Sequence, residues 1–331
     1  MKGNCGFRIA GGSINPQSQI RNPQYLSSNL PVSVPAHIIA VMNPEIVKKP
    51  FEGEMYDVMQ GAARWEMKVH EHGMVALVDV MPRLAPKGKG ADFAIVQAAR
   101  VSYGEGTKQV NEDRGLIRYL ARHRHTTPYE MVEFKFHHVM PIFVARQWIR
   151  HRTANVNEYS ARYSIVKDRF YHPSVDGVRK QSLMNRQGGT EPMDDATAKD
   201  FLAYLDKTET LYQDYENLIE KGVSRELARI GLPVSLYTEW YWKIDLHNLL
   251  HFLSLRMDSH AQQEIQDFAK AMFELIKPIV PIAAEAFVDY NFEGLHLTRL
   301  EVEAIKSGKP LDTANKRESA EWEEKKQKLG L

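Results

Sequence analysis

A switch of hydrophobic period at a proline constrains the fold of this chain most strongly. Strand-forming or apolar side chains occupy every second position before it: Val132, Phe134, Phe136, His138 and Met140. This period of two predicts a β-strand. Pro141 lacks the N–H that a further ladder bond needs, so it ends the strand and can begin a helix, predicted over 142–152. The chain must therefore combine strands with helices.

Other segments repeat this mixture. A buried strand is predicted over Met74–Met81, and helices over Ala91–Arg100, from an Asn111 cap to His123, after an Asp245 cap, and over Ala261–Phe287. Pro278 and Pro281 break or kink the last of these helices. Because strands and helices do not alternate regularly, the order favours an α+β fold, a single domain with a mixed sheet and long helices.

The two ends of the 331-residue chain differ from its middle. Proline is concentrated with Gly, Asn and Ser in the first 50 residues, which predicts an irregular extension, assigned here to residues 1–70. Its only apolar stretch, His37–Met42, can form a short strand. The folded domain is predicted over 71–300. The charged tail, 301–331, can form a solvated helix or a frayed end.

The composition excludes several classes of protein. A formal net charge of +1 gives no global field that would attract nucleic acid or a membrane surface, so neither is expected as a partner. A single cysteine excludes an internal disulfide framework and a cysteine-based zinc site within one chain. No uninterrupted apolar run approaches the roughly 20 residues that span a bilayer. The N-terminus has no apolar signal core, so the expected location is the cytoplasm.

The small net charge conceals a strongly basic stretch over residues 114–180. Ten arginines and three lysines there oppose five acidic residues, a local charge of +8. Arg146 and Arg150 lie four apart on the predicted helix and would share a face. Ser160 and Arg162, two apart in the following polar loop, would point the same way on an extended segment. Guanidinium and hydroxyl groups of this kind bind phosphate, so the sequence favours an anion site, with a solvated basic face as the alternative.

A second cluster, Arg256–His260, ends the helix that Asp245 begins. His247, His251 and Leu255 step by four along that helix and form one stripe. Two histidines at this spacing can bind zinc, but no glutamate lies between them and a third ligand is not evident. We therefore expect no metal, and we assign the stripe to packing or to hydrogen bonds with an organic ligand.

Arg150-His151-Arg152, seven residues and then Ser160 form a pattern that resembles the RHR-x7-S signature of the flavin-dependent thymidylate synthases. Six stretches resemble that family in the same order: HTTPYE, PIFVARQWIRHR, NEYSARYS, LARIGLP, LYTEWYW and LRMDSHAQQEI. The resemblance covers about 91–292. It leaves the first 70 or so residues and the tail uncovered.

The resemblance implies an enzyme that converts dUMP to dTMP. Members of the family take the carbon from methylenetetrahydrofolate, use FAD as redox carrier and NADPH as reductant, and are homotetramers with sites shared between subunits. The family needs no cysteine nucleophile, because electrostatics activates the pyrimidine and the reduced flavin supplies hydride. Cys5, the only cysteine here, lies in the predicted extension without a nearby base or cation. No G-x-G-x-x-G motif occurs, which agrees with a fold other than the Rossmann fold.

The resemblance also implies roles for individual residues. Arg256 matches the arginine that contacts the pyrimidine and favours its ionised form, so it is the expected catalytic residue. The positions that match dUMP-binding residues, besides Arg256, are Gln147, Trp148, Ile149, Arg150, Glu158, Tyr159, Ser160, Ala161, Arg162 and Arg229. The positions that match FAD-binding residues are Ser102, Thr127, Glu130, Arg150, His151, Arg152, Thr153, Glu158, Asp245, His247, His251 and Leu255. His125 matches a histidine near the flavin ring that can guide folate or dioxygen access.

Three positions depart from the family pattern. Asp245, His247 and His251 stand where relatives often have Asn, Arg and Asn. An aspartate cannot donate a hydrogen bond to FAD as asparagine can, so Asp245 can serve mainly as a helix cap. Two other functions stay open here. One is a basic module that contacts nucleic acid, which leaves HTTPYE and LRMDSHAQ unexplained. The other is a flavoprotein of this fold without synthase activity.

Overall fold

Five strands form the sheet that positions the candidate site, in the order β2-β3-β5-β9-β6. The computed structural model describes residues 48–51, 53–101, 113–182 and 188–331, and its main compact unit begins at Phe51. The α+β expectation is confirmed, but every neighbouring pair of these strands is antiparallel, so the sheet is not mixed. The strands are β2 (Trp65–Val69), β3 (Gly73–Met81), β5 (Glu133–Pro141), β6 (Asn155–Glu158) and β9 (Tyr237–Asp245).

The remaining elements are two separate two-stranded sheets and the helices. β1 (Met55–Asp57) pairs with β4 (Leu84–Pro86), and β7 (Arg179–Gln181) pairs with β8 (Gly189–Pro192). The α-helices are α1 (Asp92–Val101), α2 (Asp113–Arg122), α3 (Ile142–Trp148), α4 (Asp195–Glu220), α5 (Arg225–Ala228), α6 (Leu246–Arg256), α7 (Gln263–Ile276), α8 (Pro281–Phe287), α9 (Arg299–Ser307) and α10 (Lys316–Leu329). Short 3₁₀ turns are η1 (Thr127–Met131), η2 (Val175–Gly177) and η3 (Arg229–Gly231), and η4 (Val288–Phe292) is π-helical.

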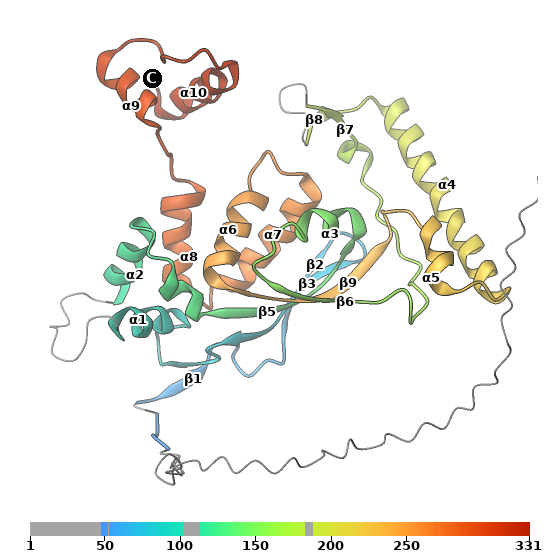
Figure 1. Ribbon diagram of the computed structural model, residues 1–331, viewed down its shortest axis with the longest axis horizontal. Coiled ribbons are helices and arrows are strands. Elements are labelled where there is room, and N and C mark those ends of the chain that lie inside the picture. Colours follow the sequence, from blue (N-terminus) through green and yellow to red (C-terminus); the bar gives the residue numbers. More distant parts are fainter. Residues whose placement is uncertain (1–47, 52, 102–112, 183–187) are drawn as a thin grey trace, which may run out of the picture. The chain divides into compact units, whose positions relative to one another are not determined.

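One face of the sheet is apolar and packs against α3, α6 and α7 (Figure 1). The strand residues buried on this face include Phe134, Phe136, Trp240, Trp242 and Ile244. The Trp242 ring lies 5.5 Å from Trp148 of α3 and 5.3 Å from Phe252 of α6, between ring centroids. Because large aromatic side chains bury much apolar area, these contacts contribute strongly to the core. They also fix the end of α3 beside α6, and both helices carry candidate site residues.

The period switch at Pro141 is confirmed, since β5 ends there and α3 begins at the next residue. However, α3 ends at Trp148 rather than at residue 152. Arg150 therefore lies in the turn beyond the helix, and the prediction that it shares a helix face with Arg146 is wrong. The helix ends early because the chain must return as β6 and pair along the edge of β9. Long-range strand pairing overrides the local helical pattern here.

The predicted Asp245 cap and the predicted proline break are confirmed. Asp245 Oδ1 accepts a hydrogen bond from the backbone N–H of Asn248 at 2.9 Å and begins α6. The helix predicted to end at His123 is α2, and it buries Leu116, Ile117 and Leu120. The proposed Asn111 cap lies outside the described residues. The long helix predicted through the prolines is divided into α7 and α8.

The two ends also differ in detail from the expectation. β1 and β2 lie within residues 1–70, which the composition predicted to be irregular, and β2 pairs along its whole length with β3. The predicted strand at 37–42 lies outside the described residues. The tail is helical rather than frayed: Trp322 of α10 is buried, and Lys325 donates to the buried Glu301 of α9 at 2.8 Å. No helix in the described ranges is long and apolar enough to span a membrane.

Candidate active site

Arg256 ends α6 and contacts the segment that follows α3. Its Nε donates to His151 Nε2 at 3.0 Å, and its Nη2 approaches the backbone oxygen of Gln147 at 3.4 Å. The Gln147 amide in turn donates to the side chain of Gln262, the residue that directly precedes α7. Arg256 therefore contacts two predicted site residues that lie more than 100 positions before it in the sequence. We refer to Arg256, His151 and Gln147 as the Arg256 centre.

The electrostatics of this centre leave the guanidinium charge available. Burial is the main cause that lowers the pKa of His151 to about 4, and the charges of Arg256 and His251 add to it. The imidazole is therefore neutral at pH 7, and its Nε2 accepts from Arg256 while Nδ1 carries the proton. Burial also lowers the pKa of Arg256, but a guanidinium remains protonated at this pH. A neutral acceptor thus orients Arg256 without neutralising it.

Arg146 of α3, three arginines in the segment that follows it and Arg229 of η3 lack the carboxylate partners that many other arginines of the protein have. Arg64, Arg83, Arg100 and Arg118, for example, each form an ion pair with Asp or Glu. No ion pair within the described ranges includes Arg146, Arg150, Arg152, Arg162 or Arg229. A guanidinium group without a carboxylate partner is available to bind an anion. The arrangement fits phosphate groups of a ligand.

Ser160 forms a turn, not the extended segment that the sequence predicted. Its backbone oxygen accepts from Tyr163 N and Ser164 N, and its Oγ accepts weakly from Arg162 N at 3.4 Å. Helix α5 adjoins the same turn, because Arg225 donates to the backbone oxygen of Tyr163 at 2.7 Å. Arg229 begins η3 directly after α5. The closed turn arises because Ala161 packs against the small core under α4 and α5.

A second group of predicted residues lines a pocket of about 380 Å³ between α2, η1, α6 and the α8–η4 segment. The apolar part of its lining includes Leu120, Leu250, Ala283 and Phe287. The polar and cationic part consists of Arg124, His125, Thr126, Tyr129, His247, His251, Ser254, Asn291 and His296. No carboxylate is present among these lining residues. The His251 and His151 rings lie 6.3 Å apart, so the pocket adjoins the Arg256 centre.

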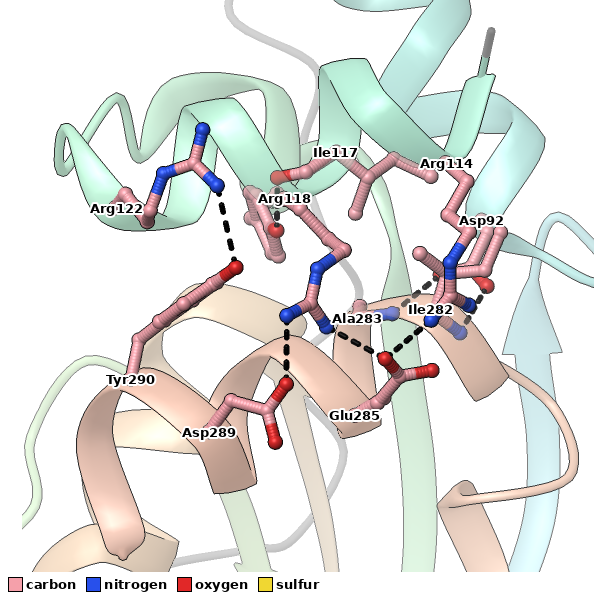
Figure 2. A network of polar contacts seen from close by, with 11 residues as sticks. Asp92, Arg114, Ile117, Arg118, Arg122, Ile282, Ala283, Glu285, Asp289 and Tyr290 are labelled. Carbon is pink, nitrogen blue, oxygen red and sulfur yellow. Dashed lines mark hydrogen bonds and ion pairs between the residues drawn. The ribbon is translucent and has the colours of Figure 1, made fainter. Parts of the chain in front are cut away.

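Polar contacts between α2 and α8 hold two walls of this pocket together (Figure 2). Arg118 donates to Glu285 and to Asp289, both at 2.6 Å. One turn further along α2, Arg122 donates to the hydroxyl of Tyr290 at 3.3 Å. These partners come from one side of α8 and η4. The contacts therefore fix the end of α2, next to His125, relative to α8.

Asp92 fixes the beginning of α8. Its side chain is 1% exposed, and its two oxygens accept from the backbone N–H groups of Ile282 and Ala283 at 2.8 and 3.1 Å (Figure 2). Burial raises the pKa of Asp92 to about 7, although both hydrogen bonds favour the carboxylate. Because Ala283 lines the pocket, this cap positions part of the pocket wall.

The other predicted site residues fall into four groups. Trp148 is wholly buried and is not exposed to a ligand, and Ile149 is half-buried. Both carboxylate oxygens of Asp245 accept from Asn248, which confirms the capping role. Ser102 lies outside the described residues. The rest are accessible at least in part: Thr127, Glu130, Arg152, Thr153, Glu158, Tyr159 and Leu255.

Several residues at the site were not singled out from the sequence. Gln262 lies within the LRMDSHAQQEI stretch, so that motif contained a signal for it. Arg124, Asn291 and His296 carried no signal, because they meet only when η4 folds back against α2 and α6. No group of three or more His, Cys, Asp or Glu side chains in the described part of the chain is placed to hold a metal ion.

Comparison with known proteins identifies the family. The family model described as "Thymidylate synthase complementing protein" matches residues 76–282. This protein belongs to that family. The matched region contains the Arg256 centre and the Ser160 turn, whereas Asn291 and His296 lie beyond it.

Relatives of this chain include proteins named flavin-dependent thymidylate synthase. The one from Dictyostelium discoideum is 68% identical over 292 residues, which are 88% of this chain and 94% of the relative. The one from Wolbachia pipientis is 54% identical over 242 residues, 73% of this chain and 82% of the relative. A solved structure of the UMP/dUMP methylase PolB from Streptomyces cacaoi, bound with 5-Br UMP, has a TM-score of 0.59 and 32% identity. The match covers 68% of this chain and 98% of the PolB chain.

Proposed function

We propose that this protein is a flavin-dependent thymidylate synthase, which converts dUMP to dTMP by reductive methylation and so serves dTTP synthesis. Methylenetetrahydrofolate is the carbon donor, FAD the cofactor and NADPH its reductant. The observation that carries this proposal is the Arg256 centre, a charged guanidinium oriented by a neutral histidine that lies between Arg150 and Arg152 in the sequence. Relatives of that name at 68% and 54% identity support it.

The residues present fit both a nucleotide and a dinucleotide cofactor. Unpaired arginines suit phosphate and pyrophosphate groups. The adjoining pocket has apolar walls for a planar ring and imidazole groups at polar positions, without an opposing carboxylate. When bound and reduced, FAD supplies the hydride that completes the methyl group. We assign the binding of FAD to His151, Arg152, Thr153, His247 and His251. His125 is assigned to a position near the flavin ring, where it controls the access of folate or dioxygen.

The reacting pyrimidine is placed against Arg256 in this proposal. Negative charge on the N3–C4–O4 edge of uracil is stabilised by a fixed guanidinium, and this raises the nucleophilicity of C5 toward the incoming carbon. His151 and the Gln147 backbone orient the guanidinium through the two contacts at 3.0 and 3.4 Å. No enzyme cysteine takes part, and the single cysteine, Cys5, is not needed.

The phosphate of dUMP is assigned to the Ser160 turn. Ser160 and Arg162 lie on that turn, and Arg229 follows the helix that adjoins it. Ser160 acts as a binding group in this account, because its Oγ contacts a backbone N–H rather than a base. The backbone of Tyr159 and Ala161 closes over the base.

The assembly is proposed to be a homotetramer with sites shared between subunits. Helices α4 and α5 carry exposed apolar side chains that favour association: Phe201, Tyr204, Leu211, Leu218 and Leu227. Arg229 lies directly after this surface, so a partner seated there could receive it. Light scattering on the purified protein tests the mass of the assembly. A cytoplasmic location remains a prediction.

Tritium release from [5-³H]dUMP tests the proposed function. The purified protein receives dUMP, methylenetetrahydrofolate, FAD and NADPH, and each component is omitted in turn. Release that requires both the folate and the reduced flavin supports the proposal. A yellow protein that releases no tritium is instead a flavoprotein without synthase activity. A protein that binds no flavin would overturn the assignment of the pocket as well.

A further inference from the structure

We infer that Asn291 and His296 are ligand-binding residues of the 380 Å³ pocket, where they recognise a planar heteroaromatic ring that carries an anionic arm. The inference rests on the proposed function, because that function supplies two ligands of this chemistry, FAD and methylenetetrahydrofolate. Neither residue lies within the region that the family model matches. The family resemblance assigned neither of them a role.

The π-helical turn η4 directs Asn291 toward the pocket. Phe287, the last residue of α8, and Asn291 both line it. The residues between them include Asp289 and Tyr290, which contact the arginines of α2 (Figure 2). One short segment therefore divides its side chains between a fixed contact with α2 and the pocket. Single π-turns within helices are frequent at functional sites.

The chemistry of the lining defines the ligand. Phe287 and Leu250 offer apolar surface to a ring face, and the amide of Asn291 can donate to and accept from a ring edge. His296 joins the imidazole groups of the opposite walls, and Arg124 adds a guanidinium. With no carboxylate in the lining, these groups favour an anionic arm such as a phosphate or a glutamate.

Arg124 provides an independent indication of a ligand site. Its backbone has φ of 55°, a left-handed conformation that is uncommon for residues other than glycine. Strained positions of this kind cluster at active sites and ligand clamps. No side-chain partner of Arg124 occurs among the described residues, so its guanidinium is free for an anion.

Four variants of the full-length protein test the inference: Asn291→Ala, Asn291→Asp, His296→Ala and the control Glu293→Ala. Glu293 is exposed on the same segment and does not line the pocket. Two quantities are measured, the dissociation constant of FAD by flavin fluorescence and the KM of methylenetetrahydrofolate at saturating FAD. Circular dichroism confirms that each variant is folded. Asn291→Asp is nearly isosteric, so it remains informative if an alanine variant does not fold.

Each alanine variant should weaken the ligand that occupies this pocket by about three- to tenfold, the effect of one lost hydrogen bond. Asn291→Asp should weaken it more, because a carboxylate repels the anionic arm. An increase in the dissociation constant of FAD assigns the pocket to FAD. An increase only in the KM of methylenetetrahydrofolate assigns the pocket to the folate. If every folded variant matches the control in both quantities, the inference is wrong. FAD binding is measured without turnover, so failure of the proposed synthase activity would be seen separately.

Discussion

The substitution Asp92→Asn should change how the stability of the protein depends on pH. The folded protein holds the Asp92 proton with a pKa of about 7, against the ordinary value of 3.8. A pKa raised by folding means that this group favours the folded state most in acid, and that the contribution is lost as pH rises through about 7. At 1.36 kcal/mol per pKa unit, the loss between pH 5 and pH 8 is about 3 kcal/mol of unfolding free energy.

Urea unfolding of the wild type and Asp92→Asn at pH 5, 6, 7 and 8 measures this loss. Asparagine cannot ionise, so the unfolding free energy of the variant relative to the wild type should rise by about 3 kcal/mol across that range. Asn also offers only one acceptor to Ile282 and Ala283, which adds a destabilisation of about 1–3 kcal/mol that does not depend on pH. The test is therefore how the difference in unfolding free energy between variant and wild type changes with pH, and not the size of that difference at one pH. All other titrating groups cancel in the difference.

Asp312→Asn is the matched control, because Asp312 is exposed in the loop between α9 and α10. It should leave the pH profile parallel to that of the wild type. A constant offset between Asp92→Asn and the wild type from pH 5 to pH 8 would refute the reasoning, since it would mean that Asp92 is ionised over the whole range. The capping geometry at 2.8 and 3.1 Å would then hold a fully charged carboxylate.

Three further substitutions have definite expected outcomes. Ser160→Ala should weaken dUMP binding, measured by calorimetry, more than it lowers turnover at saturating dUMP; a dead enzyme with normal dUMP affinity would contradict its role as a binding group. Cys5→Ser should leave tritium release unchanged, whereas loss of activity in a folded variant would revive a covalent mechanism. Arg118→Ala should lower the unfolding free energy by about 1 kcal/mol, a modest value because Glu285 and Asp289 are partly exposed. It should also weaken FAD binding, whereas Arg299→Ala, which removes an exposed pair with Glu303, should not. Equal FAD affinity in both variants would disprove that the Arg118 contacts with α8 and η4 hold the pocket walls in place.

Local signals in the sequence predicted the elements that carry the site. The alternation before Pro141 and the Asp245 cap depend on neighbouring residues only, so both predictions are confirmed. The end of α3 and the Ser160 turn were predicted wrongly, because both depend on distant partners. β6 pairs with β9, and Ala161 packs under α4 and α5.

The candidate site was predicted in its parts but not in its arrangement. The RHR-x7-S pattern located His151, and LRMDSHAQQEI located Arg256, yet only the fold places Arg256 Nε 3.0 Å from His151 Nε2. The pocket was harder to predict, because its lining runs from Leu120 to His296. His296 and Asn291 follow no periodic pattern and match no motif. Their position is set by the π-turn and by the contacts of Arg118 and Arg122 with α8 and η4.

The most direct test of the account is the turnover of Arg256→Ala and Arg256→Lys, measured as tritium release at saturating dUMP with FAD bound. The account predicts that Arg256→Ala loses at least about 100-fold in turnover, the effect of removing one group that stabilises transition-state charge. Arg256→Lys should also be slow, because an ammonium cannot reproduce the planar fork that contacts His151 and Gln147. Both variants should stay folded and keep the flavin absorbance. Turnover of a folded, flavin-containing Arg256→Ala within about threefold of the wild type would contradict the central claim.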